Sequence, residues 1–373
     1  MKRLVKLFFF GMTLFLWTST ASADSLATER VQYFRKAVPD LIINEPIKNL
    51  KKGINVYYIQ CGVPVCEEIK TGIEGATKAL GWKLNIVTHQ DSPDTVQQAW
   101  QAVTDANPDL VLASGNPREW FEDQLATLDQ RKVPVVVWSL PEGYRPGKGL
   151  SANLLTGDDY YFYGVLMADY IVSESAGKAN SIFFGLPIFP VLELVSQGFE
   201  TEYKRACPSC QLKIVPIDIM DLVNGQVPQV VISELQANPQ ANWIPFAFGG
   251  MLFGVPEALE SVDLAKQVSS ISQAGGPLNF NFIENGAVQR AEVGLASEYL
   301  GWRAIDVGAR LLSGQDIGKP KANQLVKISG HPDVLAAGLP LQLIEKGTLS
   351  NPNKLWPGVE NFQARFKRIW GVN

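Results

Sequence analysis

The sequence predicts an α/β protein with two domains, each built on a parallel sheet. From residue 54 onward, short apolar runs rich in β-branched residues alternate with longer amphipathic stretches. Continuous apolar strands separated by helix-length segments indicate parallel sheets with helices on both faces. The chain has 373 residues, which is more than a single hydrophobic core usually organises, so two domains are expected.

The N-terminus has the features of a secretory signal peptide over residues 1–23. A basic start at residues 1–3 precedes an apolar run from Leu7 to Trp17, and small residues follow it. The run is too short to span a bilayer comfortably, and its small-residue flank fits a signal peptidase. A retained membrane anchor is the alternative, but no polar stop-transfer flank follows the run. We therefore expect cleavage before Asp24 and a soluble periplasmic chain.

The charge balance argues against nucleic acid as a partner. The chain carries 33 basic and 37 acidic residues, a formal net charge of −4. Loss of residues 1–23 would remove three positive charges and no acidic ones, which lowers the net charge to −7. Such a surface repels nucleic acid and anionic lipid. We expect a monomer that binds neither.

Ten segments have the composition of strands, and helices are expected between most of them. The expected strands are 54–60, 83–88, 110–113, 133–138, 150–154, 181–186, 212–216, 244–248, 267–271 and 291–295. Several of these segments end in Gly, Pro, Ser or Asn. In open α/β sheets the loops at the carboxyl ends of the strands are where ligands bind, so these loops are the place to look for a site.

Helix boundaries are marked at two places. Ser92 is a candidate N-cap, with Pro93 at the first helical position. A second helix is expected from Asp159 to Ile171, with Gly177 ending it. Residues 330–373 are rich in Gly and Pro, and we expect them to form a tail wrapped over the surface.

Four cysteines occur as two close pairs, Cys61 with Cys66 and Cys207 with Cys210. An exported chain meets an oxidising compartment, so two local disulfides are expected. The second pair also has the spacing of a thioredoxin-like redox site. That site needs a preceding strand and a helix N-terminus to lower the thiol pKa, whereas this pair follows a helix-like stretch and precedes a strand.

Catalytic patterns are missing from the sequence. It contains no Gly-x-Ser-x-Gly, no zinc-binding His-Glu pair and no phosphate loop. The adjacent carboxylates Asp158 and Asp159 are better explained as favourable charge at a helix N-terminus. With two histidines, acid-base chemistry near neutral pH has few candidates. We expect a protein that is not an enzyme and has neither a cofactor nor a metal site.

The order of these elements resembles the type I periplasmic binding proteins, the ribose- and xylose-binding class. The resemblance covers about residues 50–315 and rests on element spacing and on weak local motifs at 54–59, 132–137 and 157–164. It implies a protein that captures a small-molecule ligand and delivers it to the permease subunits of an ABC importer. The alternatives are a sugar-binding protein of the same class and a sensor lobe that presents ligand to a chemoreceptor or histidine kinase.

The resemblance further implies two Rossmann-like lobes with parallel sheets and a hinge that the chain crosses three times. The crossings are expected near Ser151–Thr156, Gly276–Asn281 and Val326–Ser329. The N-terminal lobe would then comprise 24–152 and 279–328, and the C-terminal lobe 153–278 and 329–373. A ligand contacts both lobes only in the closed form, so binding shifts the population toward closure.

The strand ends lack the charged side chains that sugar binders of this class carry. Trp138 and Ser139 stand where an acidic-basic pair is common, and Phe248 where Asn or Asp is expected. A polyol site loses about 1–3 kcal/mol for each missing hydrogen-bond partner. We therefore expect a ligand less polar than a pentose, with a planar or cyclic apolar body. The candidate ligand-binding residues are Gln60, Ser114, Asn116, Trp138, Ser139, Phe189, Phe248, Gln273 and Tyr299.

Two of these assignments have structural alternatives. Any one of the aromatic residues is explained equally well by packing between a sheet and its covering helix, although their occurrence at four separate strand or loop ends favours a cleft. In this fold the loop between Cys61 and Cys66 touches the cleft. A disulfide there would either stiffen the loop and reduce the entropy cost of closing or act as a purely local staple.

Overall fold

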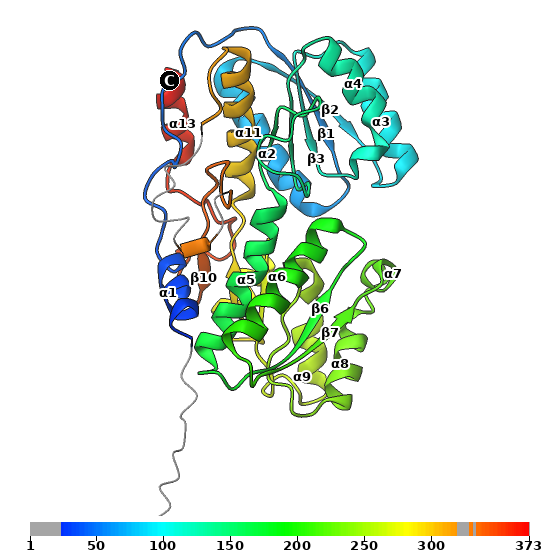
Figure 1. Ribbon diagram of the computed structural model, residues 1–373, viewed down its shortest axis with the longest axis vertical. Coiled ribbons are helices and arrows are strands. Elements are labelled where there is room, and N and C mark those ends of the chain that lie inside the picture. The colour runs from blue at the N-terminus through cyan, green and yellow to red at the C-terminus, as the bar shows by residue number, and fades with distance from the viewer. Residues whose placement is uncertain (1–23, 319–327, 331–332, 373) are drawn as a thin grey trace, which may run out of the picture.

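The computed structural model describes residues 24–318, 328–330 and 333–372. The expected signal peptide, residues 1–23, and residues 326–327 of the crossing expected at 326–329 lie outside the described residues. Within the described part, none of the helices has the length and apolar character needed to cross a membrane. Figure 1 shows two α/β lobes, one above the other.

The first lobe is built on a parallel sheet with the strand order β2-β1-β3-β4-β5. The strands are β1 (Asn55–Gln60), β2 (Lys83–Thr88), β3 (Leu110–Ser114), β4 (Val135–Trp138) and β5 (Ala152–Asn153). β3 and β4 are buried along their whole length, as expected for inner strands with helices on both faces. The expected strands of this lobe are confirmed within a few residues.

Helices cover both faces of this sheet (Figure 1). On one face, α3 (Pro93–Asp105) and α4 (Glu122–Gln130) bury Trp100 against Phe121 with their rings stacked 4.2 Å apart. On the other face, α2 (Pro64–Leu80) packs closely on α11 (Ser297–Leu312), which in turn contacts α13 (Phe362–Trp370). A side chain at Gly72 of α2 would place its Cβ 2.2 Å from the Glu298 carbonyl oxygen, so glycine permits this approach.

The expected start of α3 is confirmed. Ser92 and Thr95 form a capping box at its N-terminus, and Pro93 is the first helical residue. α5 (Gly157–Glu174) has a comparable start, since the hydroxyl of Thr156 accepts from the Asp159 amide while the Asp159 carboxylate accepts from Thr156. Asp159 therefore serves as a helix-capping acid.

The second lobe contains two groups of strands. β6 (Asn180–Gly185) pairs with β7 (Gln211–Pro216), and β8 (Ser270–Gln273) pairs with β9 (Gln289–Val293), which pairs in turn with β10 (Leu343–Glu345). All these pairs are parallel except β9 with β10. The edge strand β10 was not expected, because its three residues lie in the segment assigned to a surface tail.

An irregular segment, residues 242–247, joins the two groups of strands into one sheet. The Ile182 amide donates to Trp243 on one side, and the Ile244 amide donates to Ser269 on the other, at 2.9 and 2.8 Å. A strand was expected at 244–248, but Pro245 lacks the amide that the ladder toward β6 requires. The structure accordingly has isolated bridges here, at Trp243 and Phe246.

Helices also cover the second sheet. They are α1 (Ser25–Phe34), α5, α6 (Pro190–Ala206), α7 (Ile219–Val223), α8 (Val227–Ala237), α9 (Val255–Ser261) and α10 (Pro277–Glu284). α5 and α6 make the closest contact, because a Cβ at Gly164 or at Gly198 would lie 2.0 Å from a carbonyl oxygen of the other helix. Arg30 attaches α1 to them through ion pairs with Asp169 and Glu202 at 3.2 and 2.9 Å.

The connections between the lobes differ in part from those expected. The chain leaves the first sheet after β5 and enters α5, as the expected crossing at 151–156 requires. Its return falls at 294–296, after β9, because α10 and β9 belong to the second sheet. The segment 279–293, assigned above to the N-terminal lobe, therefore lies in the C-terminal one.

The two ends of the chain add further connections. α1 packs on α5 of the second lobe, and residues 35–54 then run to the first sheet (Figure 1). At the other end, β10 joins the second sheet while α13 packs on α11 of the first lobe. The prediction of a surface tail is wrong, since Leu335, Leu343 and Phe366 are buried. Their apolar side chains complete the cores that the strand-helix repeats leave open.

Candidate functional site

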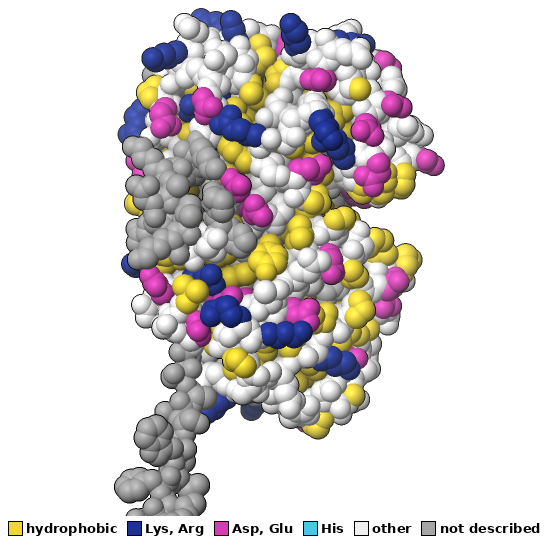
Figure 2. Space-filling view, in the orientation of Figure 1, with side chains coloured by type: hydrophobic (Ala, Val, Ile, Leu, Met, Phe, Trp, Pro, Cys, Tyr) yellow, Lys and Arg dark blue, Asp and Glu magenta, His cyan; other side chains and the backbone are white. Residues whose placement is uncertain are grey.

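The loops that follow the strands of the two sheets face one another across a cleft. Ser139 follows β4 of the first lobe, and its hydroxyl lies 2.8 Å from that of Tyr160 on α5 of the second lobe. The Glu68 carboxylate of α2 lies 3.3 Å from the position a Cβ would take at Gly276, in the loop after β8. Figure 2 shows the hollow between the lobes at the right of the molecule. The carboxyl edges of both sheets therefore border it.

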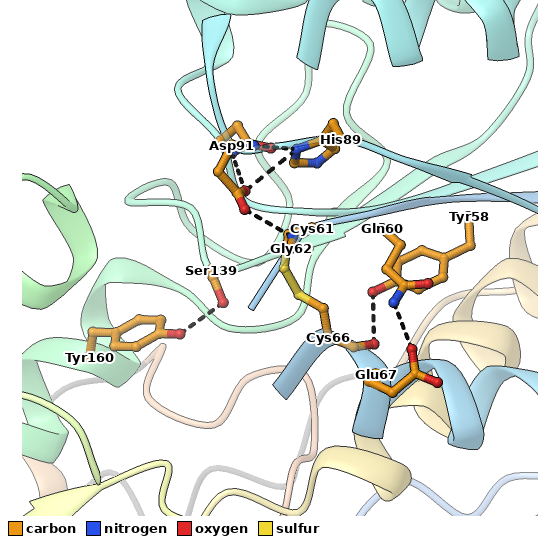
Figure 3. Close-up of a disulfide and its surroundings, with 11 residues drawn as sticks. Tyr58, Gln60, Cys61, Gly62, Cys66, Glu67, His89, Asp91, Ser139 and Tyr160 are labelled. Atoms are coloured by element: carbon orange, nitrogen blue, oxygen red, sulfur yellow. Dashed lines mark hydrogen bonds and ion pairs between the residues drawn. A yellow bond between two sulfur atoms is a disulfide. The ribbon is translucent and has the colours of Figure 1, made fainter. Parts of the chain in front are cut away.

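Asp91 joins three loops of the first lobe (Figure 3). Its carboxylate accepts from the Gly62 amide, after β1, at 2.9 Å, and from the Asn116 side chain, after β3, at 3.4 Å. The Asp91 amide donates to Nδ1 of His89 at 3.1 Å. Burial lowers the pKa of His89 against the opposing charge of Asp91. This edge of the cleft is thus organised around one carboxylate and a neutral imidazole.

A disulfide between Cys61 and Cys66 lies beside Asp91 and confirms the expected pairing. It ties the end of β1 to the first turn of α2, and the Tyr58 hydroxyl donates to the Cys66 carbonyl at 3.3 Å. The second expected disulfide, Cys207 with Cys210, is also confirmed, and it lies between α6 and β7. The Cys61–Cys66 disulfide therefore borders the cleft, whereas the Cys207–Cys210 disulfide lies at the amino end of β7, opposite the strand end that faces the cleft.

Two acids of α2 lie behind this loop. Glu67 accepts from the Gln60 side chain at 2.9 Å, and its ion pair with Lys70 lowers its pKa. Glu68 accepts from the hydroxyl of Ser297 at 2.6 Å, while burial raises its pKa. Because Ser297 begins α11 directly after the crossing at 294–296, Glu68 lies where the two lobes meet.

Ser139 occupies a conformation that few non-glycine residues adopt, with φ at +64°. Its amide donates to the Leu155 carbonyl of the first crossing at 3.0 Å. Its hydroxyl partner, Tyr160, is buried, which raises the pKa of Tyr160 to about 12. The pair therefore stays protonated near neutral pH and fixes the loop after β4 against α5.

Apart from the loop after β7, which contains Asp218 and Asp221, the edge of the second lobe is uncharged and apolar. Residues 179–192, 243–256 and 267–283, which contain the loops after β6, after residue 247 and after β8, include no Asp, Glu, Lys, Arg or His. These loops and the one after β7 expose large apolar side chains. The exposed residues are Ile188, Phe189, Met220, Val223, Phe253 and Leu278. Across the cleft, Val63 in the loop after β1 is exposed as well.

Glycines allow these loops to lie close together. A Cβ at Gly249 would lie 2.6 Å from Cα of Gly275, and one at Gly250 would lie 2.5 Å from the ring of Phe248. Glu292 accepts from the Gly275 amide and from the side chains of Ser272 and Gln289. Burial raises the pKa of Glu292 to about 8 in spite of these hydrogen bonds.

The structure brings seven of the nine candidate residues to the cleft edges. In the first lobe these are Gln60, Ser114, Asn116 and Ser139, at or just after strand ends. In the second lobe they are Gln273 at the end of β8, Phe189 in the loop after β6, and Phe248 after the segment 242–247. Trp138 is 1% exposed and packs on Tyr58 with ring centroids 5.6 Å apart. It supports the first edge from within the core.

Tyr299 lies in the core of the first lobe. It is 1% exposed, and its ring packs on Phe362 and Phe366 of α13 at 5.5 and 5.2 Å. The reason is the position of the crossing at 294–296, which places α11 against α2. Aromatic packing between helices accounts for this residue.

Sequence reasoning missed several residues of these edges. Asp91 had a usable signal, since it lies between an expected strand and the N-cap Ser92. Glu68 had no such signal in the sequence, because its hydrogen-bond partner Ser297 is distant along the chain. Among the described residues no group of three metal-binding side chains gathers.

Two α/β lobes whose strand ends face a shared cleft define the class of hinged binding proteins. The model of the periplasmic binding protein domain family matches residues 54–316, and the chain belongs to this family. Comparison with curated protein sequences gives no match.

Solved structures of similar fold include several binding proteins. The chain superposes on a glucose-galactose binding protein, GanP, from Geobacillus stearothermophilus with a TM-score of 0.62 and 19% identity, covering 72% of this chain and 94% of that one. A periplasmic solute-binding protein of an ABC transporter from Actinobacillus succinogenes 130z, with bound D-allose, superposes with a TM-score of 0.63 and 18% identity. The match covers 71% of this chain and 93% of that one. An ABC sugar transporter subunit from Rhodobacter sphaeroides 2.4.1 superposes with a TM-score of 0.63 and 15% identity, covering 78% of this chain and 98% of that one.

Proposed function

We propose that the protein is a periplasmic solute-binding protein that captures a small, relatively apolar ligand, aromatic or cyclic, between its lobes. It would deliver this ligand to the permease subunits of an ABC importer in the inner membrane and carry out no chemistry on it. The family and the fold support capture in a hinged cleft. The nature of the ligand is argued from the residues of this chain.

The observation that carries the proposal is the apolar edge of the second lobe. Three stretches of sequence that include strand ends of this lobe have no charged residue. Phe189 is 36% exposed, Phe253 47% and Ile188 59%. Enclosing a ring would remove apolar surface of each side chain from water, which contributes about 25 cal/mol of favourable free energy per Å² buried. A pentose, whose hydroxyls need polar partners, would leave much of this surface unmatched.

A sugar is the second candidate ligand. The similar structures include a glucose-galactose binding protein and one with bound D-allose. In this chain the amides of Gln60, Asn116 and Gln273 lie at strand ends, where they would meet hydroxyl groups. The shortage of charged partners on the second lobe weighs against a sugar.

Native mass spectrometry of protein purified from the periplasm tests the proposal. A bound molecule that is released on denaturation and contains a ring with few oxygen atoms supports it. A released monosaccharide would contradict the ligand assignment and leave solute binding intact. If the partner is instead a chemoreceptor or histidine kinase, cross-linking in cells would capture that receptor in place of a permease.

A further inference from the structure

The buried amides at the cleft edges have fixed orientations. The Asn116 side-chain nitrogen donates to the Asp91 carboxylate, and that of Gln273 donates to the Ala247 carbonyl at 2.9 Å. Neither acceptor carries a proton to donate, so each amide must turn its nitrogen toward it. The oxygens of Asn116 and Gln273 then point elsewhere. Both are buried and have no hydrogen-bond partner among the residues that the structure describes.

These two oxygens accept hydrogen bonds and cannot donate them. A buried acceptor without a partner costs about 1–3 kcal/mol, so a ligand that supplies donors would remove that cost. The hydroxyl of Ser114, at the end of β3, is also buried and lacks a partner within the described ranges. It can accept as well as donate. The oxygens of Asn116 and Gln273 therefore match a donor on the ligand, and the hydroxyl of Ser114 is compatible with one.

The charges near the cleft point in the same direction. Asp91 and Glu68 place carboxylates on the first lobe, and stretches 179–192, 243–256 and 267–283 of the second lobe carry no charge. The loop after β7 adds two more acids, Asp218 and Asp221. Lys70 is paired with Glu67, and the Arg118 guanidinium lies 3.8 Å from Glu142 while also donating to the Lys148 carbonyl. Both Lys70 and Arg118 are therefore already paired and do not provide a free counterion for an anionic ligand.

A carboxylate enclosed here would therefore lie near like charges and lose its hydration without a counterion. Burial of an unpaired charge is strongly unfavourable. Enclosing a hydroxyl or a protonated amine is favourable by comparison, since both groups donate hydrogen bonds to carboxylate and amide oxygens.

We propose that the ligand combines its apolar ring with a hydrogen-bond donor, a hydroxyl or a protonated amine, and that ring compounds bearing a carboxylate are rejected. The donor lies toward Asp91 and Asn116 of the first lobe, and the ring lies toward Phe189 and Phe253 of the second. This inference rests on the proposed function and makes it more specific.

Three probes with the same ring test it: benzyl alcohol, benzylamine and benzoate, with the cyclohexyl analogues as a second set. Thermal unfolding of the full mature protein is recorded with each probe, and D-allose is included. We expect stabilisation by the alcohol, the amine or both, and none by the carboxylate. Equal or greater stabilisation by benzoate overturns this inference and leaves the proposed function standing. Stabilisation by D-allose alone overturns both, as does the absence of any shift with ring compounds.

The Asp91→Asn variant separates the two kinds of donor. Asparagine still accepts from the Gly62 amide but removes the charge, so benzylamine should bind at least about tenfold more weakly while benzyl alcohol changes little. Removal of the like charge should also raise the affinity for benzoate. Asp94→Asn is the matched control, because Asp94 is an exposed acid in the first turn of α3. If both variants behave alike toward benzylamine and benzoate, Asp91 does not face the ligand and the placement of the donor is wrong.

Discussion

The hydroxyl of Tyr160, in the first turns of α5, lies 2.8 Å from the hydroxyl of Ser139, which follows β4. The two residues belong to different lobes, and the first crossing between the lobes runs beside them through Leu155. Figure 3 shows this hydrogen bond to the left of the disulfide. The bond therefore ties the loop after β4 to the hinge.

The Tyr160→Phe variant removes this bond and leaves the buried ring in place. We expect the free energy of unfolding to fall by about 1 kcal/mol, since the Ser139 hydroxyl loses its partner. Urea denaturation measures the change, with Tyr57→Phe on β1 as a control outside the hinge. Because burial raises the pKa of Tyr160 to about 12, the difference should be constant from pH 6 to pH 9. A difference that disappears within this range would contradict the assignment.

The two disulfides allow a matched comparison. Each closes a short loop, so replacing either pair by serine should cost about 2 kcal/mol of stability. Only the pair Cys61 and Cys66 borders the cleft, so its double variant should also weaken binding of whichever ring compound stabilises the wild type most. The double variant of Cys207 and Cys210 should bind that compound like the wild type. Equal binding by both would show that the first disulfide is a local staple.

Glu292 should make stability depend on pH. Its pKa rises from the usual 4.5 to about 8 because it is buried beneath the loop after β8. Between these values the folded state holds more protons than the unfolded state, so the free energy of unfolding should fall as pH rises, by up to about 5 kcal/mol. Urea denaturation at pH 5, 7 and 9 measures the slope. The Glu292→Gln variant should show a flatter dependence, and an unchanged slope would assign the effect to other groups.

The apolar edge should matter for binding more than for folding. Phe189 and Phe253 are 36% and 47% exposed, so their replacement by alanine should change stability by no more than about 0.5 kcal/mol. The affinity for a ring compound should fall about tenfold in each variant, because an aromatic contact is lost. Ile214→Ala, at 37% exposure on β7, is the control. Calorimetric titration would contradict the assignment if the three variants bound alike.

Sequence reasoning located most of the fold because strand and helix patterns are local. The ends of β2, the N-cap Ser92 and both disulfides follow from spacing along the chain. Errors arose where distant segments decide the outcome. The short strand β10 exists because β9 offers it an edge, and the crossing after β9 depends on which sheet α10 covers.

The same limit applies to the site. Residues at strand ends, such as Asn116 and Phe189, could be placed because parallel strands bring their carboxyl ends to one edge. Tyr299 could not, since its surroundings depend on α13, more than sixty residues later. The contact of Glu68 with Ser297 likewise joins helices α2 and α11 of the first lobe, whose residues are 229 positions apart, so no local pattern relates them.

Calorimetric titration of the mature protein with benzyl alcohol and with D-allose, each at two temperatures, tests the apolar cleft most directly. Our account predicts that the ring compound binds with a negative heat-capacity change, the mark of buried apolar surface, and that the sugar produces no binding heat. Binding of D-allose without binding of benzyl alcohol would contradict it.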